Sequence, residues 1–225
     1  MDAGGPDDAG TTQAVAPPGA PALDLGSRLR AERLRQGMSL REMARRLGVS
    51  ASALSQIETG KAQPSVNTLF DIVNLLNTSL DGLLAGTPTQ RREPAADARD
   101  AAGPRGPETE GFFSFQRSGD HETLELESGV QWRRLTSGSL PGVEFLHVIY
   151  APGACSSSDG GFMRHAGQEF GHVLAGRLKV DVGFDTYELA VGDTISFPAT
   201  TPHRLSNPGS EPTSAIWLVI GRHAP

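Results

Sequence analysis

The chain has 225 residues, of which 37% are hydrophobic, and it contains 27 glycines and a single cysteine, Cys155. This length allows two small domains, and the single cysteine excludes an internal disulfide or a zinc site built from several cysteines. The formal net charge of −6 at pH 7 argues weakly against a nucleic-acid partner. No run of about 18 apolar residues and no signal segment is present, so we expect a cytoplasmic protein that does not bind a membrane.

Composition divides the chain into four segments. Residues 1–23 lack Lys and Arg and are rich in Ala, Gly, Pro and Asp, which predicts a disordered tail. Residues 86–110 contain four prolines and no aromatic or large aliphatic residue, which predicts a flexible linker. The two segments that remain, 24–85 and 111–225, differ in hydrophobic period and are predicted to be separate domains.

Charge is concentrated in the first of these domains. Residues 24–85 carry eight Lys or Arg and six Asp or Glu, a balance of +2, whereas the rest of the chain carries twelve and twenty, a balance of −8. Seven arginines fall within residues 28–46 alone. A basic surface on one small domain is what phosphate contacts require, so this distribution favours a nucleic-acid partner despite the net charge.

Residues 24–85 have a helical period and are predicted to form an all-α bundle of five helices. Serine caps and glycine stops set the expected boundaries: a first helix from Leu25 to Gly37, then helices capped by Ser39, Ser50 and Ser65, and a short fifth at 79–84.

The stretch from Ser39 to Glu58 is typical of a helix-turn-helix, in which the second helix enters the major groove of DNA. Residues near the start of that helix must be small or polar and face outward, while Leu54 and Ile57 are expected to face inward. The candidate DNA-binding residues are Ser39, Arg41, Ser50, Ala51, Ser52, Gln56 and Lys61. Among them, Gln56 suits adenine, and the two cations suit phosphates. The alternative is a helical hairpin without a DNA role.

The sequence LGSRLRAERLRQGMSLREMARRLGVSASALSQIETGKAQPSVNTLFDIVNLL resembles the Cro/cI-type (XRE-family) helix-turn-helix domains of phage repressors. This resemblance implies that Arg33 and Glu58 form a partly buried ion pair between the first and third helices. It also implies that Ser50, Ala51, Ser52 and Gln56 face the DNA.

Residues 111–225 contain many short runs rich in Val, Ile and aromatic residues, which predict an all-β sandwich or barrel. Two stretches, GFMRHAGQEFGHVLAG at 161–176 and GDTISFPATTPHRLSN at 192–207, resemble the two signature motifs of the cupin superfamily. We therefore expect an α+β chain whose second domain is a cupin barrel, a double-stranded β-helix. Its core and pocket are expected to contain Trp132, Phe145, Tyr150, Phe170, Phe197 and Trp217.

His165, Glu169 and His203 are the candidate site of this barrel. Two imidazoles and one carboxylate can form a facial triad around a divalent ion such as Fe, Zn or Mn. Met163 stands where cupins usually have a further histidine, and a thioether is a poor ligand for such ions. A metal-free barrel, in which the three side chains bond one another or an organic ligand, remains the alternative.

Together these features predict a transcriptional regulator that reads a double-stranded DNA operator. Its cupin domain is expected to bind a small effector, to form a homodimer, or both, as in the bacterial regulators that this arrangement resembles. An alternative is a mononuclear iron-dependent oxygenase, because the fosfomycin-forming epoxidase joins similar domains and uses a similar triad. A metabolite-binding module with a vestigial helical domain is a third reading. The retained DNA-facing residues favour a regulator, so we expect no enzymatic activity and no catalytic residues.

Overall fold

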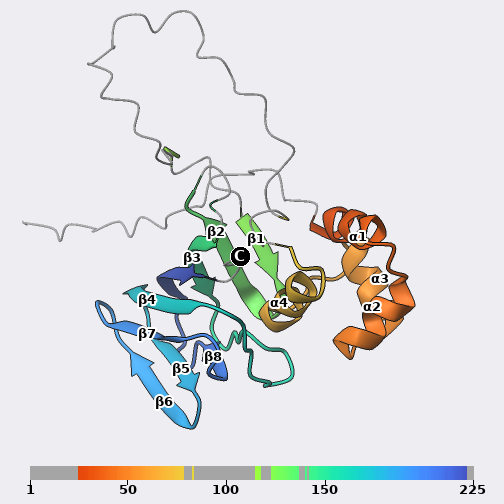
Figure 1. Ribbon diagram of the computed structural model, residues 1–225. Helices are drawn as coiled ribbons and strands as arrows, with labels where there is room; N and C mark the ends of the chain where they lie inside the picture. Colours follow the sequence, from red (N-terminus) through yellow and green to blue (C-terminus); the bar gives the residue numbers. More distant parts are fainter. Residues whose placement is uncertain are drawn as a thin grey trace, which may run out of the picture.

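The computed structural model describes residues 25–78, 83, 115–117, 123–136, 140 and 142–221. Two layers of the fold are clear in Figure 1, a group of helices on one side and a curved β-structure on the other. The tail predicted at 1–23 and the linker predicted at 86–110 lie outside the described residues.

Four α-helices form the N-terminal domain in the described part of the chain: α1 (Leu25–Arg35), α2 (Leu40–Leu47), α3 (Ala51–Glu58) and α4 (Val66–Leu75). The fifth helix expected at 79–84 lies outside the described residues, except for Leu83, which is helical and buried. A bundle of five helices is therefore not confirmed.

Local sequence explains where these helices begin and end. The hydroxyls of Ser39, Ser50 and Ser65 each accept a hydrogen bond from the backbone N–H three residues later, at 3.1, 3.0 and 3.1 Å. Each bond satisfies an amide that has no partner within its helix, as predicted for an N-cap. Gly48 ends α2 at a φ of 68°, a left-handed conformation that glycine adopts without strain and that turns the chain toward α3.

Nine strands form the C-terminal domain in the described residues. They are β1 (Thr123–Leu126), β2 (Val130–Arg134), β3 (Val143–Tyr150), β4 (Gln168–Ala175), β5 (Leu178–Val182), β6 (Asp185–Leu189), β7 (Thr194–Pro198), β8 (His203–Ser206) and β9 (Thr213–Ile220), with a 3-10 turn at Glu127–Gly129. The strands pair in the order β1-β2-β3-β9-β4-β7 in one sheet and β6-β5-β8 in the other, all antiparallel. This β-rich domain agrees with the predicted cupin.

Alternating burial along the strands separates an inner face from an outer one. Trp132, Tyr150 and Trp217 are buried, as expected, because alternate side chains of a strand point to opposite faces. The prediction was wrong for Phe145 and Phe170, which lie on the outer face, and Phe170 is 40% exposed. Each of them occupies the position next to a buried residue of its strand, so its side chain points to the opposite face of the sheet.

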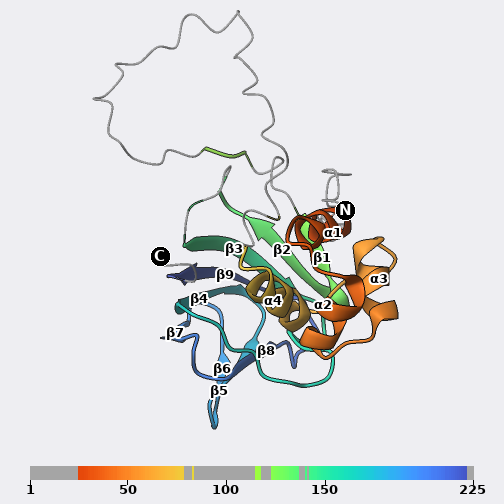
Figure 2. The same cartoon turned by 45° about the vertical axis from the view of Figure 1, so that its right-hand side comes forward.

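The two domains are in contact through α4. Figures 1 and 2 show α4 lying beside β1 and β2, whereas α1, α2 and α3 lie farther out. The backbone N–H of Asn67 donates to the carbonyl of Ser156 at 3.1 Å, and that of Glu127 donates to the carbonyl of Pro64 at 2.9 Å. No helix within the described residues is long and apolar enough to cross a membrane.

Candidate DNA-binding surface and buried histidine–carboxylate cluster

The α2–turn–α3 unit presents the side chains predicted to meet DNA. Ser39, Arg41, Ser50, Ser52, Gln56 and Lys61 are exposed, and Ala51 is partly exposed. Leu54 and Ile57 face the core, with 0% and 8% of their surface exposed, as predicted. The structure therefore brings the predicted base-facing and phosphate-facing residues to one accessible helix and its flanks.

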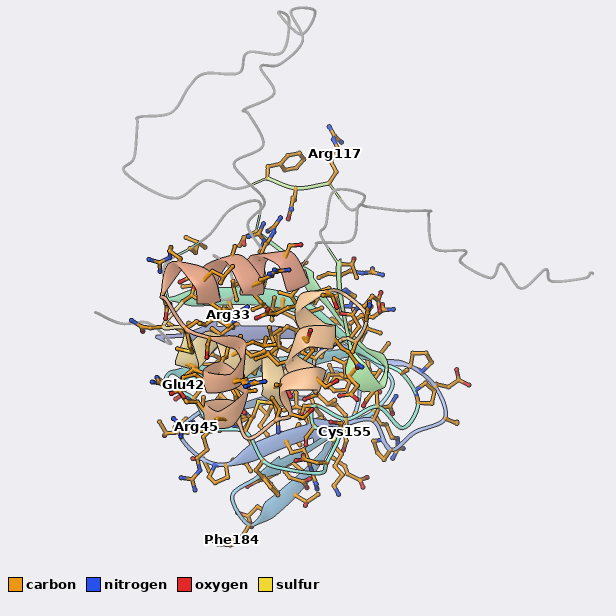
Figure 3. All side chains as sticks on the ribbon, turned by 90° about the vertical axis from the view of Figure 1, so that its right-hand side faces the viewer. Arg33, Glu42, Arg45, Arg117, Cys155 and Phe184 are labelled. Carbon is orange, nitrogen blue, oxygen red and sulfur yellow. The ribbon has the colours of Figure 1, made fainter. Side chains whose placement is uncertain are left out.

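Four cationic side chains of the basic domain, three arginines and one lysine, differ in whether an acidic side chain already binds them. On α2, Arg45 and Arg46 both bond Glu42, at 2.8 and 2.7 Å, and these bonds lower the pKa of Glu42 to about 2. Figure 3 shows Glu42 and Arg45 together on the outer side of α2. Among the described residues, no acidic side chain pairs with Arg41 or Lys61, which leaves both cations available to phosphates.

The ion pair implied between the first and third helices is present. Arg33 donates to both carboxylate oxygens of Glu58, at 2.6 and 2.7 Å, and to the carbonyl of Met38 at 2.8 Å. Both side chains are buried, and two parallel bonds to one carboxylate fix their relative orientation. The pair therefore joins α1 to α3, the helix that carries the candidate base-contacting residues.

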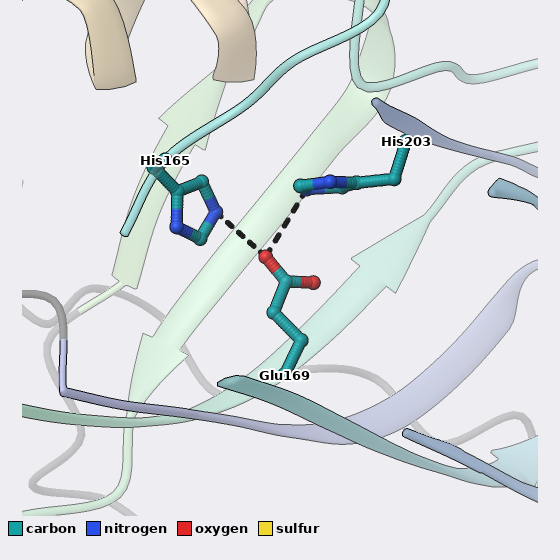
Figure 4. Close-up of side chains that lie close together, drawn as sticks. All are labelled: His165, Glu169 and His203. Atoms are coloured by element: carbon teal, nitrogen blue, oxygen red, sulfur yellow. Dashed lines mark ion pairs between the residues drawn. The ribbon is translucent and has the colours of Figure 1, made fainter. Parts of the chain in front are cut away.

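Within the barrel, three residues from different elements converge. Glu169 lies on β4, His165 on the segment before it, and His203 at the start of β8. The Oε1 atom of Glu169 lies 2.6 Å from Nε2 of His165 and 3.1 Å from Nε2 of His203, as Figure 4 shows. All three side chains are buried, so the cluster predicted from the sequence forms inside the barrel.

The backbone determines which ring nitrogens face the carboxylate. Nδ1 of His165 lies 2.9 Å from the carbonyl of Ala166, and Nδ1 of His203 lies 2.8 Å from the carbonyl of Thr201. A carbonyl can only accept, so each Nδ1 carries the proton, and in a neutral ring Nε2 then carries a lone pair. Two such lone pairs and a carboxylate oxygen point at one place. A shared cation, either a proton or a metal ion, is needed to hold them together.

The electrostatics of Glu169 agree with this requirement. Burial alone would raise the pKa of Glu169, but hydrogen bonds and positive charge from His165 and His203, when a proton is the shared cation, lower this pKa to about 2. Its second oxygen accepts a hydrogen bond of 2.8 Å from the indole of Trp217. The carboxylate is therefore anionic and oriented, which is the state that binds a divalent ion.

Sequence reasoning missed the role of Trp217 in this cluster. The residue opposite Trp217 on β4 is Gly171, where a Cβ atom would come within 2.1 Å of the indole ring. Only a glycine leaves room for the indole beside Glu169. The pairing of these strands joins residues 48 positions apart, so no local motif reveals the bond.

Met163 lines the cavity beside the cluster without joining it. Its backbone pairs with that of His203 through two hydrogen bonds, of 2.9 and 3.0 Å. The cavity is small, about 20 Å³, and its walls are apolar apart from Glu169 and Tyr150. Met163 thus contributes a thioether to the apolar wall of the cavity. The cluster itself offers three strong metal-ligand atoms, one each from His165, Glu169 and His203.

Comparison with known proteins agrees with both domains. Residues 29–83 match the helix-turn-helix family, and residues 146–219 match the cupin domain family. The chain joins a helix-turn-helix domain to a cupin domain. This two-domain protein is 27% identical over 204 residues to the HTH-type transcriptional regulator PuuR of Escherichia coli (strain K12), covering 89% of this chain and 94% of the relative.

One solved structure shows the same two-domain arrangement. An HTH_3 family transcriptional regulator from Vibrio cholerae superposes with a TM-score of 0.60 at 20% identity, covering 89% of this chain and 97% of that one. The fold is therefore shared across both domains. The hydroxypropylphosphonic acid epoxidase from S. wedmorenis matches with a TM-score of 0.43 at 19% identity, covering 88% and 98%, an overlap too loose to support an inference about activity.

Proposed function

We propose that this chain is a sequence-specific DNA-binding transcriptional regulator. The observation that carries the proposal is the outer face of α3, where Ser52 and Gln56 are exposed while Leu54 and Ile57 hold the helix to the core. Side chains of this kind at the start of such a helix reach base edges in the major groove. The relative PuuR and the Vibrio structure, both described as transcriptional regulators, support the same function.

A regulator explains more of the molecule than the oxygenase alternative does. An oxygenase needs the buried cluster but has no use for exposed Ser52 and Gln56 or for the cations Arg41 and Lys61 beside them, which no described acidic residue pairs. A metabolite-binding module would leave the same residues without a role. We therefore infer a binding function for the barrel, no enzymatic activity, and a cytoplasmic location beside the DNA.

The buried cluster is the proposed site of a divalent ion, Fe, Zn or Mn. His165, Glu169 and His203 would hold it, because their lone pairs already converge and the backbone already sets both imidazoles in the ligand tautomer. When bound, the ion would supply open coordination positions to a small effector. Trp217 orients the carboxylate toward it.

The regulator is also proposed to act as a homodimer, because one small helical domain makes too few contacts for tight and specific binding. The outer face of the large sheet suits a second copy of the chain. Phe145, Leu218 and Phe170 lie side by side there on β3, β9 and β4, along a shallow hollow of about 390 Å³ whose lining carries no Asp, Glu, Lys or Arg. This face is opposite the cavity, so pairing and effector binding would not compete.

The DNA proposal is tested by separating base contacts from phosphate contacts. Selection from random duplexes first identifies the preferred sequence. The variant Ser52→Ala/Gln56→Ala should then bind that sequence about 10–100-fold more weakly and keep its nonspecific binding, because a good base contact contributes about 1–3 kcal/mol.

The matched variants Arg41→Ala and Lys61→Ala should weaken binding to all sequences alike and reduce the salt slope by about one each. Selection that enriches no sequence would refute the proposal. If the Ser52/Gln56 variant kept full discrimination, the base-reading role would belong to other residues.

A further inference from the structure

The wall of the buried cavity is completed by the DNA-binding domain. Val66 and Phe70, four residues apart on one face of α4, line the cavity together with residues of the barrel. The Phe70 ring stacks on the imidazole of His165, with centroids 4.8 Å apart and planes at 24°, and lies 5.4 Å from the ring of Trp132. A helix of one domain is therefore in direct contact with the candidate ligand cluster of the other.

The contact between α4 and the barrel is of a kind that can separate. Besides the two side chains in the cavity wall, it includes the backbone bonds from Asn67 to Ser156 and from Glu127 to Pro64, and a longer bond of 3.4 Å from the Asn67 amide to the Gly161 carbonyl. These bonds are few, and water can satisfy the same backbone groups once the helix moves away. Interfaces of this character between domains permit relative motion.

The size of the cavity makes this motion necessary for a ligand. About 20 Å³ is room for a single water molecule, which needs roughly 10–15 Å³ by the same measure. Most of the other walls are side chains of paired strands, such as Trp132, Leu146 and Trp217, whose backbones are fixed by the sheets. Met163 lies outside the strands, but two backbone hydrogen bonds tie it to His203. Among the described residues that line the cavity, only Val66 and Phe70 of α4 belong to the other domain.

We propose that α4 is a removable wall of the effector site, with the Phe70 ring in the space that an effector's apolar body takes. The ligand class that fits is a small molecule with a ring-sized apolar body and one oxygen donor directed at the His165–Glu169–His203 cluster. Binding such a molecule releases the helical domain from the barrel. The inference rests on the proposed function and names how the same site acts on the DNA-binding domain.

Competition between the Phe70 ring and an effector for the same space can be measured as a change in the effector's apparent affinity. A ligand that binds only the undocked state has its apparent affinity reduced by the fraction of chains that are undocked. Removing the Phe70 ring raises the apparent affinity, and fixing α4 in place lowers it. Benzoate is a suitable probe because it combines a phenyl ring, the size of the Phe70 side chain, with a carboxylate.

The first experiment measures benzoate binding to full-length variants by isothermal titration calorimetry. Phe70→Ala should bind benzoate at least about tenfold more tightly than the wild type, with Phe70→Leu between them. Phe70→Leu keeps an apolar side chain in the helical core if alanine prevents folding. Asn74→Ala, at an exposed position of the same helix, is the matched control and should equal the wild type. Equal affinities in all four chains, or no binding to either Phe70 variant, would overturn the proposal.

The second experiment fixes the wall. The substitutions Asn67→Cys and Ser156→Cys, at two positions whose backbones are hydrogen-bonded at 3.1 Å, are combined with Cys155→Ser, and the new pair is oxidised to a disulfide. The oxidised chain should bind benzoate at least about tenfold more weakly than the reduced one, while each single-cysteine variant should not respond to oxidant. Equal binding before and after crosslinking, with the crosslink verified by mass spectrometry, would refute a moving α4.

Operator binding of the same preparations separates this inference from the proposed function. If the Phe70 substitutions and the crosslink change benzoate affinity as expected but no DNA sequence is preferred, the removable-wall proposal stands and the regulator proposal fails. If a sequence is read specifically but benzoate binding ignores both changes, the wall proposal fails alone.

Discussion

The carboxylate of Glu169 contacts three side chains, two imidazoles and one indole. One oxygen faces the two imidazoles, and the other accepts the Trp217 indole bond. Each neighbour is fixed in turn, the histidines by backbone carbonyls and the indole by the space that Gly171 leaves. Such support around a ligand set raises metal affinity, because the donors lose little freedom when the ion binds.

This cluster gives a prediction about metal content. Protein purified without chelator should carry about one Fe, Zn or Mn per chain, and Glu169→Gln should carry almost none, since an amide is a much weaker donor than a carboxylate. Plasma mass spectrometry measures the content. Glu188→Gln, an exposed change on β6, is the control and should retain the ion. A wild-type protein that stays metal-free after supplementation with all three ions would favour the cluster of proton-sharing side chains instead.

At the scale of elements, the crossing of α1 and α3 controls how the recognition helix is presented. The two helices approach so closely at Gly26 that a Cβ atom there would lie 2.4 Å from the carbonyl oxygen of Ile57. The bidentate pair of Arg33 and Glu58 joins the same helices. Close approach and a directional bond together set the angle of α3 against the rest of the domain.

Arg33→Ala should therefore destabilise the helical domain by about 3–5 kcal/mol, because it leaves the buried Glu58 carboxylate without its partner. Hydrogen exchange of α1 and α3 amides in the full-length chain measures the change and separates it from the barrel. Arg35→Ala breaks the exposed pair with Glu32 on the same helix and is the control, with no measurable effect expected. Unchanged protection of α3 in Arg33→Ala would show that the pair contributes little to stability.

Helices whose ends depend on residues close in the sequence could be predicted. Contacts between residues far apart in the sequence could not. The caps at Ser39, Ser50 and Ser65 need only the next three residues, so their helices were predicted correctly. The histidine–glutamate cluster was found because its residues carry a recognised spacing. In contrast, the contact between Phe70 and His165 joins residues 95 positions apart and depends on how the two domains meet, so no local pattern predicts it. The inward placement of Phe145 and Phe170 failed because alternation alone does not tell which face is inner.

At the scale of the whole molecule, the large sheet has two uses. Its inner face encloses the cluster and meets α4, and its outer face carries the apolar row of Phe145, Leu218 and Phe170. Two chains joined through their outer faces would keep both cavities and both helical domains accessible. Operator binding and effector binding could then be coupled within each chain, while pairing holds the two chains on one DNA site.

The outer face gives a prediction about oligomeric state. Phe170→Glu should weaken self-association at least about 30-fold, equivalent to about 2 kcal/mol, because it places a charge in an apolar interface. Light scattering coupled to gel filtration measures the mass over a range of concentrations. Phe184→Glu changes an equally large but fully exposed residue in the turn between β5 and β6, visible at the edge of Figure 3, and should leave the mass unchanged. A wild-type chain that is monomeric at every concentration would refute pairing through this face.

Both tryptophans of the chain, Trp132 and Trp217, line the same cavity. One touches the ring of Phe70, and the other bonds the Glu169 carboxylate. All indole fluorescence of the protein therefore arises from a single buried chamber, with one emitter beside α4 and one beside the ligand cluster. Water entering as α4 departs would shift the emission to longer wavelength, and a paramagnetic ion at the cluster would quench it. The tryptophan emission of the unlabelled protein would therefore report both the position of α4 and the occupancy of the cluster.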